Sequence, residues 1–95
     1  MKKLAISLLF VTLNLQATQL AFADCSDAYS YAKKGYNSDN IDDVHRYAKK
    51  TMNAAEECRC EDAYFYARKA YRSDDLDEAT NYMRKAKSAA DDCGT

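Results

Sequence analysis

Several residue types that many functions depend on are scarce or missing in this 95-residue chain. It has no proline, two glycines and a single histidine, His45. Without proline, nothing interrupts a helical pattern, and without a glycine-rich loop the chain lacks a common device for holding phosphate groups. One histidine with no ligand-spaced companion offers little for acid–base catalysis or metal binding. We therefore expect no enzyme, no cofactor and no metal centre, and we interpret His45 as a surface residue.

No charge of one sign dominates either. Lys2 and Lys3 belong to a segment that we expect to be removed, as described below. The rest of the chain has twelve basic and fifteen acidic side chains, which gives it a formal charge of −3. Proteins that bind nucleic acids carry a basic excess, so we do not expect a nucleic-acid partner. The basic pairs Lys33-Lys34 and Lys49-Lys50 alternate with acidic residues, as on solvated helix faces.

The only long apolar run lies at the N-terminus. Met1-Lys2-Lys3 is basic, Leu4–Leu13 is almost unbroken apolar sequence, and Ala21-Phe22-Ala23 follows. This order is typical of a secretory signal peptide cut after Ala23. The apolar run is too short for a membrane span of about 20 residues. We predict a signal peptide over 1–23, no membrane span after cleavage, and a periplasmic or secreted protein.

The remaining chain, 24–95, repeats itself. Residues 25–58 and 60–93 align without a gap, and sixteen of the 34 positions are identical. A period in this range is typical of stacked supersecondary units. Only Arg59 separates the copies, so we predict a single domain of two repeats in close contact.

Each copy has the pattern of two helices. At 100° per residue, one face of the first helix carries Ala28, Tyr29, Tyr31, Ala32, Gly35 and Tyr36, and one face of the second carries Ile41, Val44, Tyr47, Ala48, Thr51, Met52 and Ala55. Polar, turn-forming residues lie between them at 37–40, and Asp75 with Glu78 resembles a capping box. We predict an all-α fold of two tandem antiparallel helical hairpins, four helices in total. The periodicity places Tyr31, Tyr47, Tyr66 and Tyr82 in the core.

The four cysteines stand at the ends of the copies. A domain below about 70–80 residues usually needs a covalent or metal staple. The start of one helix and the end of the next are neighbours in an antiparallel hairpin, so we predict Cys25–Cys58 and Cys60–Cys93 among the three connectivities that four cysteines allow. The second helix is longer by about 7 Å of helix rise, which predicts some uncoiling near the bridge.

Two other uses of the cysteines fit less well. A redox pair is usually C-x-x-C in a thioredoxin-like setting, whereas Cys58 and Cys60 are separated by one residue. A zinc site typically uses two close pairs of cysteines, and this chain has one.

The second copy resembles the tetratricopeptide repeat. Asp75-Leu76-Asp77-Glu78-Ala79, followed by Tyr82 and Lys85-Ala86, is similar to the second helix of that repeat, and Ala67, Ala79 and Ala86 match its small-residue positions. The Trp-x-x-Leu-Gly opening and the terminal proline of the family are missing. Disulfides are not typical of the family, although Sel1-like relatives use bonds within hairpins. The resemblance covers both copies and implies a mini-solenoid of stacked hairpins.

The resemblance also implies a binding surface. Tetratricopeptide repeats are not enzymes, and their first helices line a concave surface that holds a peptide or helix of a partner. The matching positions here are Tyr29, Lys33, Tyr36, Tyr64, Phe65, Arg68, Tyr71 and Arg72. Aromatic faces bury apolar side chains and guanidinium groups bind carboxylates, so an acidic segment or a free C-terminus is the expected ligand.

Phe65 has two interpretations, because the first copy has Ser30 at its position. It either packs against the first repeat or belongs to the binding surface. The alternative to a binding module is a self-assembling structural protein, since two repeats without end caps can stack on further copies to give a homo-oligomer.

Overall fold

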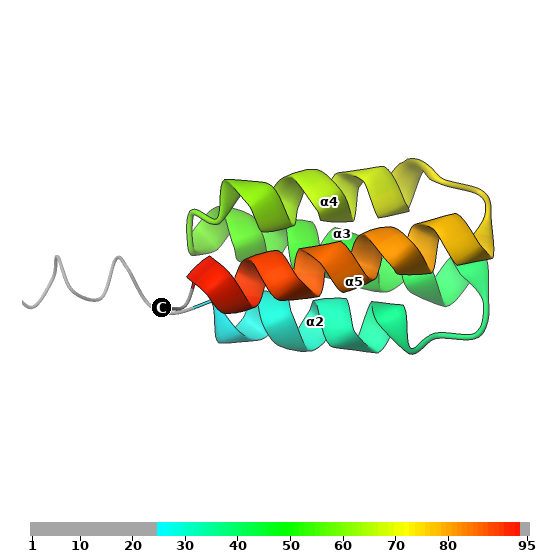
Figure 1. The fold of residues 1–95 in the computed structure, drawn as a ribbon, viewed down its shortest axis with the longest axis horizontal. Helices are drawn as coiled ribbons and strands as arrows, with labels where there is room; N and C mark the ends of the chain where they lie inside the picture. The colour runs from blue at the N-terminus through cyan, green and yellow to red at the C-terminus, as the bar shows by residue number, and fades with distance from the viewer. Residues whose placement is uncertain (1–24, 94–95) are drawn as a thin grey trace, which may run out of the picture.

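The structure is a computed structural model that describes residues 25–93. The predicted signal peptide, 1–23, lies outside the described residues. The described chain forms four helices: α2 (Ser26–Tyr36), α3 (Ile41–Glu57), α4 (Glu61–Arg72) and α5 (Leu76–Cys93). The predicted all-α class and the two tandem antiparallel hairpins, α2–α3 and α4–α5, are confirmed (Figure 1).

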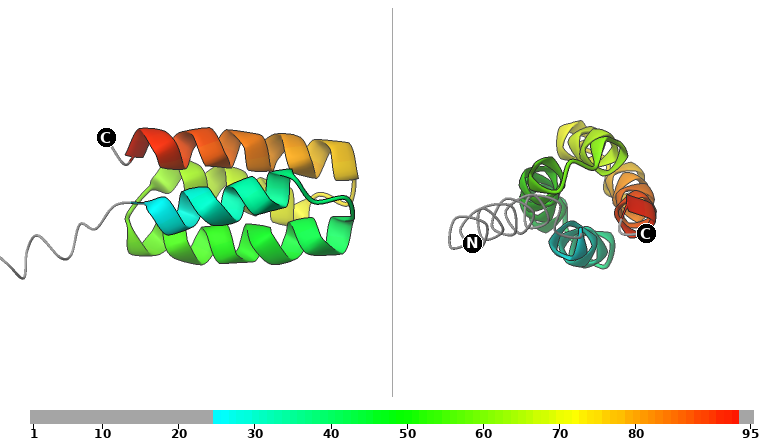
Figure 2. Two further views of the ribbon diagram at one scale, coloured as in Figure 1. Left: turned by 90° about the horizontal axis from the view of Figure 1, so that it is seen from below. Right: turned by 90° about the vertical axis from the view of Figure 1, so that its left-hand side faces the viewer.

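The two hairpins pack against each other to form a closed bundle of four helices. Along the chain each helix packs against the next, and α5 returns to pack against α2. The end-on view in Figure 2 shows the four helices around a common axis, with α2 and α4 at opposite corners. The first helices of the two repeats therefore do not line one shared surface, as they do in an open tetratricopeptide stack. The tetratricopeptide resemblance itself stays a prediction.

The core between the helices consists mostly of alanine. Its fully buried residues are Ala28, Ala32, Val44, Ala48, Ala55, Ala63, Ala67, Ala70, Ala79, Met83 and Ala86. Small side chains allow the helix backbones to approach closely. The four predicted core tyrosines are half-buried: they flank the core, and Tyr66 and Tyr82 pack against its larger cluster. Thr51 is buried as well, and its hydroxyl donates to the Tyr47 carbonyl at 2.8 Å.

Met83 is the largest fully buried side chain, and it fills space that Gly35 leaves open. A Cβ atom at Gly35 would lie 2.7 Å from Met83 Cε and 3.2 Å from Tyr47 Cβ. The equivalent positions in the repeat are Ala70 for Gly35 and Ala48 for Met83. The two copies thus share a helical pattern but differ at the centre of the bundle, where Gly35 lies beside the large Met83 and the equivalent positions, Ala70 and Ala48, are both alanine.

Side chains cap both second helices at their N-termini. Asn40 Oδ1 accepts from the Asp43 backbone N–H at 2.9 Å, and Asp75 Oδ2 accepts from Glu78 N–H at 3.0 Å. The predicted cap at Asp75 is confirmed. The return bond of a capping box goes elsewhere, because the Glu78 carboxylate accepts from the Ser73 hydroxyl at 2.7 Å.

We predict that Asn40→Ala lowers the free energy of unfolding by about 1 kcal/mol, since one of the free backbone N–H groups of α3 loses its acceptor. Thermal unfolding followed by circular dichroism should show a melting temperature lower by about 5 °C. Asp39→Ala is the matched control, because Asp39 is exposed beside the cap and its loss should leave stability nearly unchanged. Equal losses in the two variants would contradict this role of Asn40.

Both predicted disulfides are present in the structure. Cys25 is bonded to Cys58 and Cys60 to Cys93, with Cα–Cα distances of 5.5 and 5.9 Å. The expected uncoiling beside the bridges is not seen, since α2 begins directly after Cys25 and α3 ends directly before Cys58. The linkers at the opposite end, 37–40 and 73–75, span the difference in helix length instead (Figure 1).

Candidate functional site

The repeat is visible in three dimensions as an approximate twofold relation. Equivalent helices lie at opposite corners of the bundle: α2 opposite α4, and α3 opposite α5 (Figure 2). Residues 35 positions apart in sequence therefore have similar surroundings on opposite sides of the molecule. Any surface feature built by one repeat is expected to recur on the far side, provided that the residues match.

Six of the eight predicted binding residues form two such equivalent stripes. Tyr29, Lys33 and Tyr36 lie at positions i, i+4 and i+7 of α2, and therefore on one flank of that helix. Tyr64, Arg68 and Tyr71 occupy the same positions of α4. We call these the α2 stripe and the α4 stripe. Each has a cation between two tyrosines.

Each stripe borders the second helix of the other hairpin. Lys87 Nζ of α5 lies 5.2 Å from the ring centroid of Tyr36, and the His45 ring of α3 lies 5.7 Å from that of Tyr71, edge to face. The α2 stripe thus faces the α2–α5 junction and the α4 stripe the α3–α4 junction. The two stripes lie on opposite sides of the bundle, so the structure does not bring the eight predicted residues together on one concave surface.

Phe65 and Arg72 lie outside both stripes. Phe65 is 50% exposed, and it meets Tyr66 edge to face with ring centroids 5.5 Å apart. This contact lies within the second repeat, and the exposure of Phe65 gives no support to the interpretation that it packs against the first repeat. Lys69 Nζ covers its ring at 4.8 Å. Arg72 is exposed at the last position of α4.

His45 has a structural contact that the sequence did not indicate. Its Nε2 lies 2.6 Å from the backbone carbonyl of Ser73, so this nitrogen donates a hydrogen bond to the linker between α4 and α5. The ring is half-buried rather than on the open surface. His45 thereby joins the first hairpin to the second beside Tyr71.

A second pair of equivalent features lies within the hairpins. Lysines cover tyrosine rings there: Lys50 lies over Tyr31 at 5.6 Å, and its repeat equivalent Lys85 lies over Tyr66 at 5.9 Å. Lys34 also covers Tyr31 at 6.0 Å, whereas Lys69 covers Tyr82 at 5.5 Å. Such cation–π contacts contribute about 0.5–1 kcal/mol each at exposed sites. They fix the tyrosines against the bundle and leave basic groups along its sides.

Each hairpin also carries a pocket near its disulfide. The first, of about 230 Å³, is lined by Asp27, Tyr31, Lys50, Asn53, Ala54 and Glu57. The second, of about 520 Å³, is lined by Asp62, Tyr66, Lys85, Ser88, Ala89 and Asp92, together with Arg84 and Cys93. Every residue of the first pocket has its repeat equivalent in the second. Sequence reasoning missed these pockets, although the repeat offset of 35 would have linked them.

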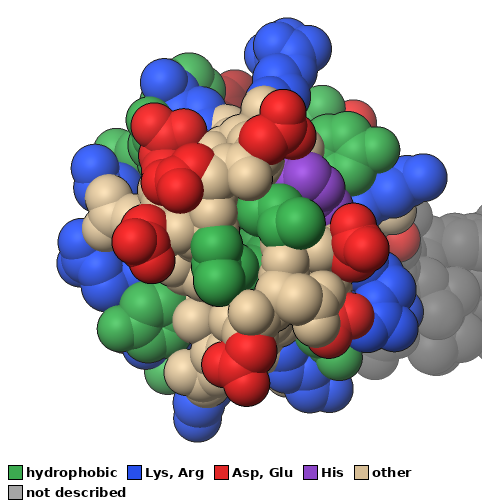
Figure 3. All heavy atoms as spheres, turned by 90° about the vertical axis from the view of Figure 1, so that its right-hand side faces the viewer, with side chains coloured by type: hydrophobic (Ala, Val, Ile, Leu, Met, Phe, Trp, Pro, Cys, Tyr) green, Lys and Arg blue, Asp and Glu red, His purple; other side chains and the backbone are tan. Residues whose placement is uncertain are grey.

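Charge is distributed along the bundle in bands. Acidic residues occupy the first turns of all four helices, whereas basic residues lie in the last turns of α2 and α4. Figure 3 views the end that carries the two linkers, where hydrophobic side chains lie at the centre, acidic ones around them and basic ones at the perimeter. A ligand that approaches the sides of the bundle therefore meets cations beside aromatic rings.

Among residues 25–93, none of the helices combines the length and the apolar character needed to cross a membrane. Comparisons with protein-family models, with curated proteins and with solved structures found no match for this chain.

Proposed function

We propose that this protein is a small exported binding module without catalytic activity, which recognises acidic segments of partner proteins through two equivalent faces. The α2 stripe and the α4 stripe are those faces. The proposal includes the cleaved signal peptide and a periplasmic or extracellular location. The two disulfides support that location, because disulfides persist mainly in oxidising compartments.

The observation that carries the proposal is the duplicated arrangement of tyrosine, cation and tyrosine. Tyr36 and Tyr71 are 38% and 42% exposed, and with Phe65 they are the most exposed large hydrophobic residues of the described chain. Tyrosine gives large contact area at low entropic cost, and the basic group between the rings can bind a carboxylate. A segment with alternating acidic and apolar side chains matches this surface.

A labelled peptide of alternating glutamate and leucine tests the proposal. Fluorescence anisotropy with the mature chain, 24–95, should give a stoichiometry of two peptides per chain. Arg68→Ala should weaken one of the two sites by about tenfold, since a hydrogen bond between charged groups is lost. Lys33→Ala should weaken the other site, and the double variant should weaken both.

Lys69→Ala is the matched control. Lys69 follows Arg68 on the same helix and is also exposed, but it covers Phe65 and Tyr82 on the other side of α4. Its removal should leave both sites intact, and the Lys33→Ala and Arg68→Ala variants should retain the wild-type melting temperature. A single binding site, or an equal loss in the Lys69→Ala variant, would show that the stripes are not the binding faces. Light scattering of the purified chain separates this function from self-assembly, which predicts species larger than a monomer.

A further inference from the structure

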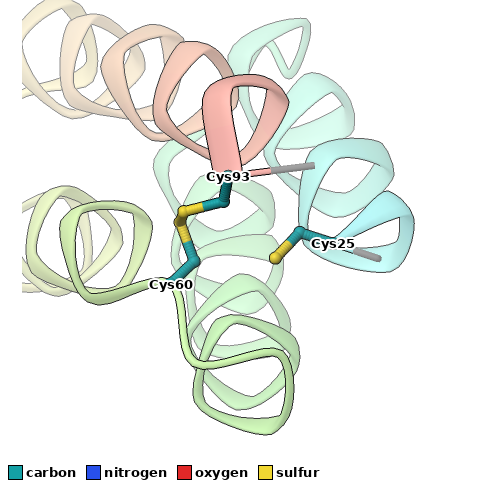
Figure 4. A group of neighbouring side chains, drawn as sticks. All are labelled: Cys25, Cys60 and Cys93. Carbon is teal, nitrogen blue, oxygen red and sulfur yellow. A yellow bond between two sulfur atoms is a disulfide. The ribbon is translucent and has the colours of Figure 1, made fainter. Parts of the chain in front are cut away.

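The two disulfides contact each other at one end of the bundle. The Sγ atoms of Cys25, Cys60 and Cys93 all lie within 4.8 Å of one another, although Cys25 belongs to a different bridge from the other two. Figure 4 shows the Cys25 sulfur directed toward the Cys60–Cys93 bridge. Both bridges stand at this end because only Arg59 separates Cys58 from Cys60, and as a result each bridge is close enough to exchange with the other.

The four sulfurs differ in their access to solvent. Cys25 and Cys60 are 4% and 1% exposed, Cys58 is half-buried, and Cys93 is exposed at the end of α5. Cys93 also lines the pocket of about 520 Å³ described above. That pocket carries charges of both signs, Asp62 and Asp92 with Arg84 and Lys85, so no single charge repels an approaching thiolate. A small thiol can therefore reach Cys93 before it reaches any other sulfur.

In each disulfide one cysteine stands at a helix N-terminus and the other at a helix C-terminus. Cys60 and Cys25 are the N-cap residues of α4 and α2, and neither side chain makes a capping hydrogen bond there. A thiolate at a helix N-terminus is stabilised by the free backbone N–H groups and the helix dipole. Cys93 and Cys58 stand at helix C-termini, where a negative charge is disfavoured. In thiol–disulfide exchange the more stable thiolate leaves faster, so Cys60 is the better leaving group of its bridge.

We propose that the Cys60–Cys93 bridge is a thiol-reactive site for small monothiols, and that its opening is transferred to the Cys25–Cys58 bridge. In the first step an external thiolate attacks Cys93 Sγ. A mixed disulfide forms on Cys93, the Cys60–Cys93 bond breaks, and the electron pair leaves on Cys60. In the second step the Cys60 thiolate attacks Cys25 Sγ, which lies within 4.8 Å, a Cys25–Cys60 bond forms, and Cys58 leaves as a thiolate that takes up a proton from water. Proximity selects this step, because the helix termini alone would favour Cys25 as the leaving group.

This proposal is independent of the binding function, because it uses none of the stripe residues. The net change is one added thiol per chain. The two disulfides within the chain become one disulfide within the chain, one mixed disulfide on Cys93 and one free thiol at Cys58. No other oxidant or reductant is consumed. The half-buried Cys58 becomes the free thiol of the product.

Peptide mapping of the oxidised mature chain tests both steps. The chain is treated with 2-mercaptoethanol for increasing times, acidified, blocked with N-ethylmaleimide and digested with trypsin. Cleavage after Arg59 separates Cys58 from Cys60, and cleavage at Lys33, Lys50 and Lys87 leaves each cysteine on its own peptide. We expect the mercaptoethanol adduct on Cys93, loss of the Cys25–Cys58 peptide pair, gain of a Cys25–Cys60 pair, and maleimide on Cys58.

Two results would overturn the proposal. An adduct distributed equally between Cys58 and Cys93, or no adduct, contradicts the first step. An adduct on Cys93 with maleimide on Cys60 and an intact Cys25–Cys58 pair at all times contradicts the transfer. The double variant Cys25→Ser/Cys58→Ser is the control, because it lacks the acceptor bond and should keep maleimide on Cys60. If that variant does not fold, the time course of the wild-type chain decides the question alone.

Discussion

Removal of the first bridge by Cys25→Ser/Cys58→Ser is expected to lower the free energy of unfolding by about 4 kcal/mol. The bond joins residues 33 apart in sequence, and in the chain-entropy model a loop of this size restricts the unfolded chain by about that amount. A domain of this size has a total stability of roughly 4–10 kcal/mol. The variant should therefore unfold at much lower urea concentration, measured by circular dichroism at 222 nm.

The second bridge supplies the comparison. Cys60–Cys93 has the same sequence separation, so Cys60→Ser/Cys93→Ser should lose a similar amount. Removal of all four cysteines should leave a chain that is mostly unfolded at 37 °C. If the four-serine chain keeps the melting temperature of the parent, the alanine-rich core alone is sufficient, and the disulfides do not determine folding.

Met83→Ala is expected to cost about 2–5 kcal/mol, the range for truncating a large buried side chain. Met83 is fully buried among small residues, and the rigid helix backbones around it cannot collapse into the cavity. Urea denaturation of the oxidised protein measures this loss. Met52→Ala is the matched control, because Met52 is half-buried at the edge of the same cluster and should lose less.

A double-mutant cycle with Gly35 tests the packing argument more directly. Gly35→Ala alone introduces a Cβ that would lie 2.7 Å from Met83 Cε, and such overpacking costs about 1–3 kcal/mol. In the Met83→Ala background the same change should cost much less, since both close contacts with Met83 are gone and only that with Tyr47 Cβ at 3.2 Å remains, while alanine favours helix by about 1 kcal/mol over glycine. Gly35→Ala effects of the same sign and size in both backgrounds would show that the two residues do not compete for space.

The repeat and the helical periodicity predicted the elements of the fold well. Apolar positions such as Ala32 and Val44 recur at helical spacing, and antiparallel geometry within a hairpin determines which cysteines meet. Each of these depends on interactions local in sequence. The tyrosines flanking the core were harder to place, because Tyr31 and Tyr66 satisfy the helical period equally well as core residues or as flanking residues covered by lysine.

How the two hairpins meet could not be predicted in the same way. Periodicity shows which face of a helix is apolar, but it does not show whether α4 packs beside α2 or diagonally from it. Alanine at most core positions accommodates both arrangements, since small side chains impose few steric restrictions. The split of the predicted binding residues into two stripes, and the exposure of Phe65, follow from that single choice.

Arg59 alone joins the two halves, and its backbone adopts a left-handed conformation with φ of 59°. If the two hairpins were separate chains, they would have to form a dimer about the same axis, and such a dimer dissociates on dilution. The one-residue junction makes that encounter intramolecular, at an effective concentration set by a very short tether. The bundle therefore keeps its twofold design while its assembly no longer depends on the protein concentration.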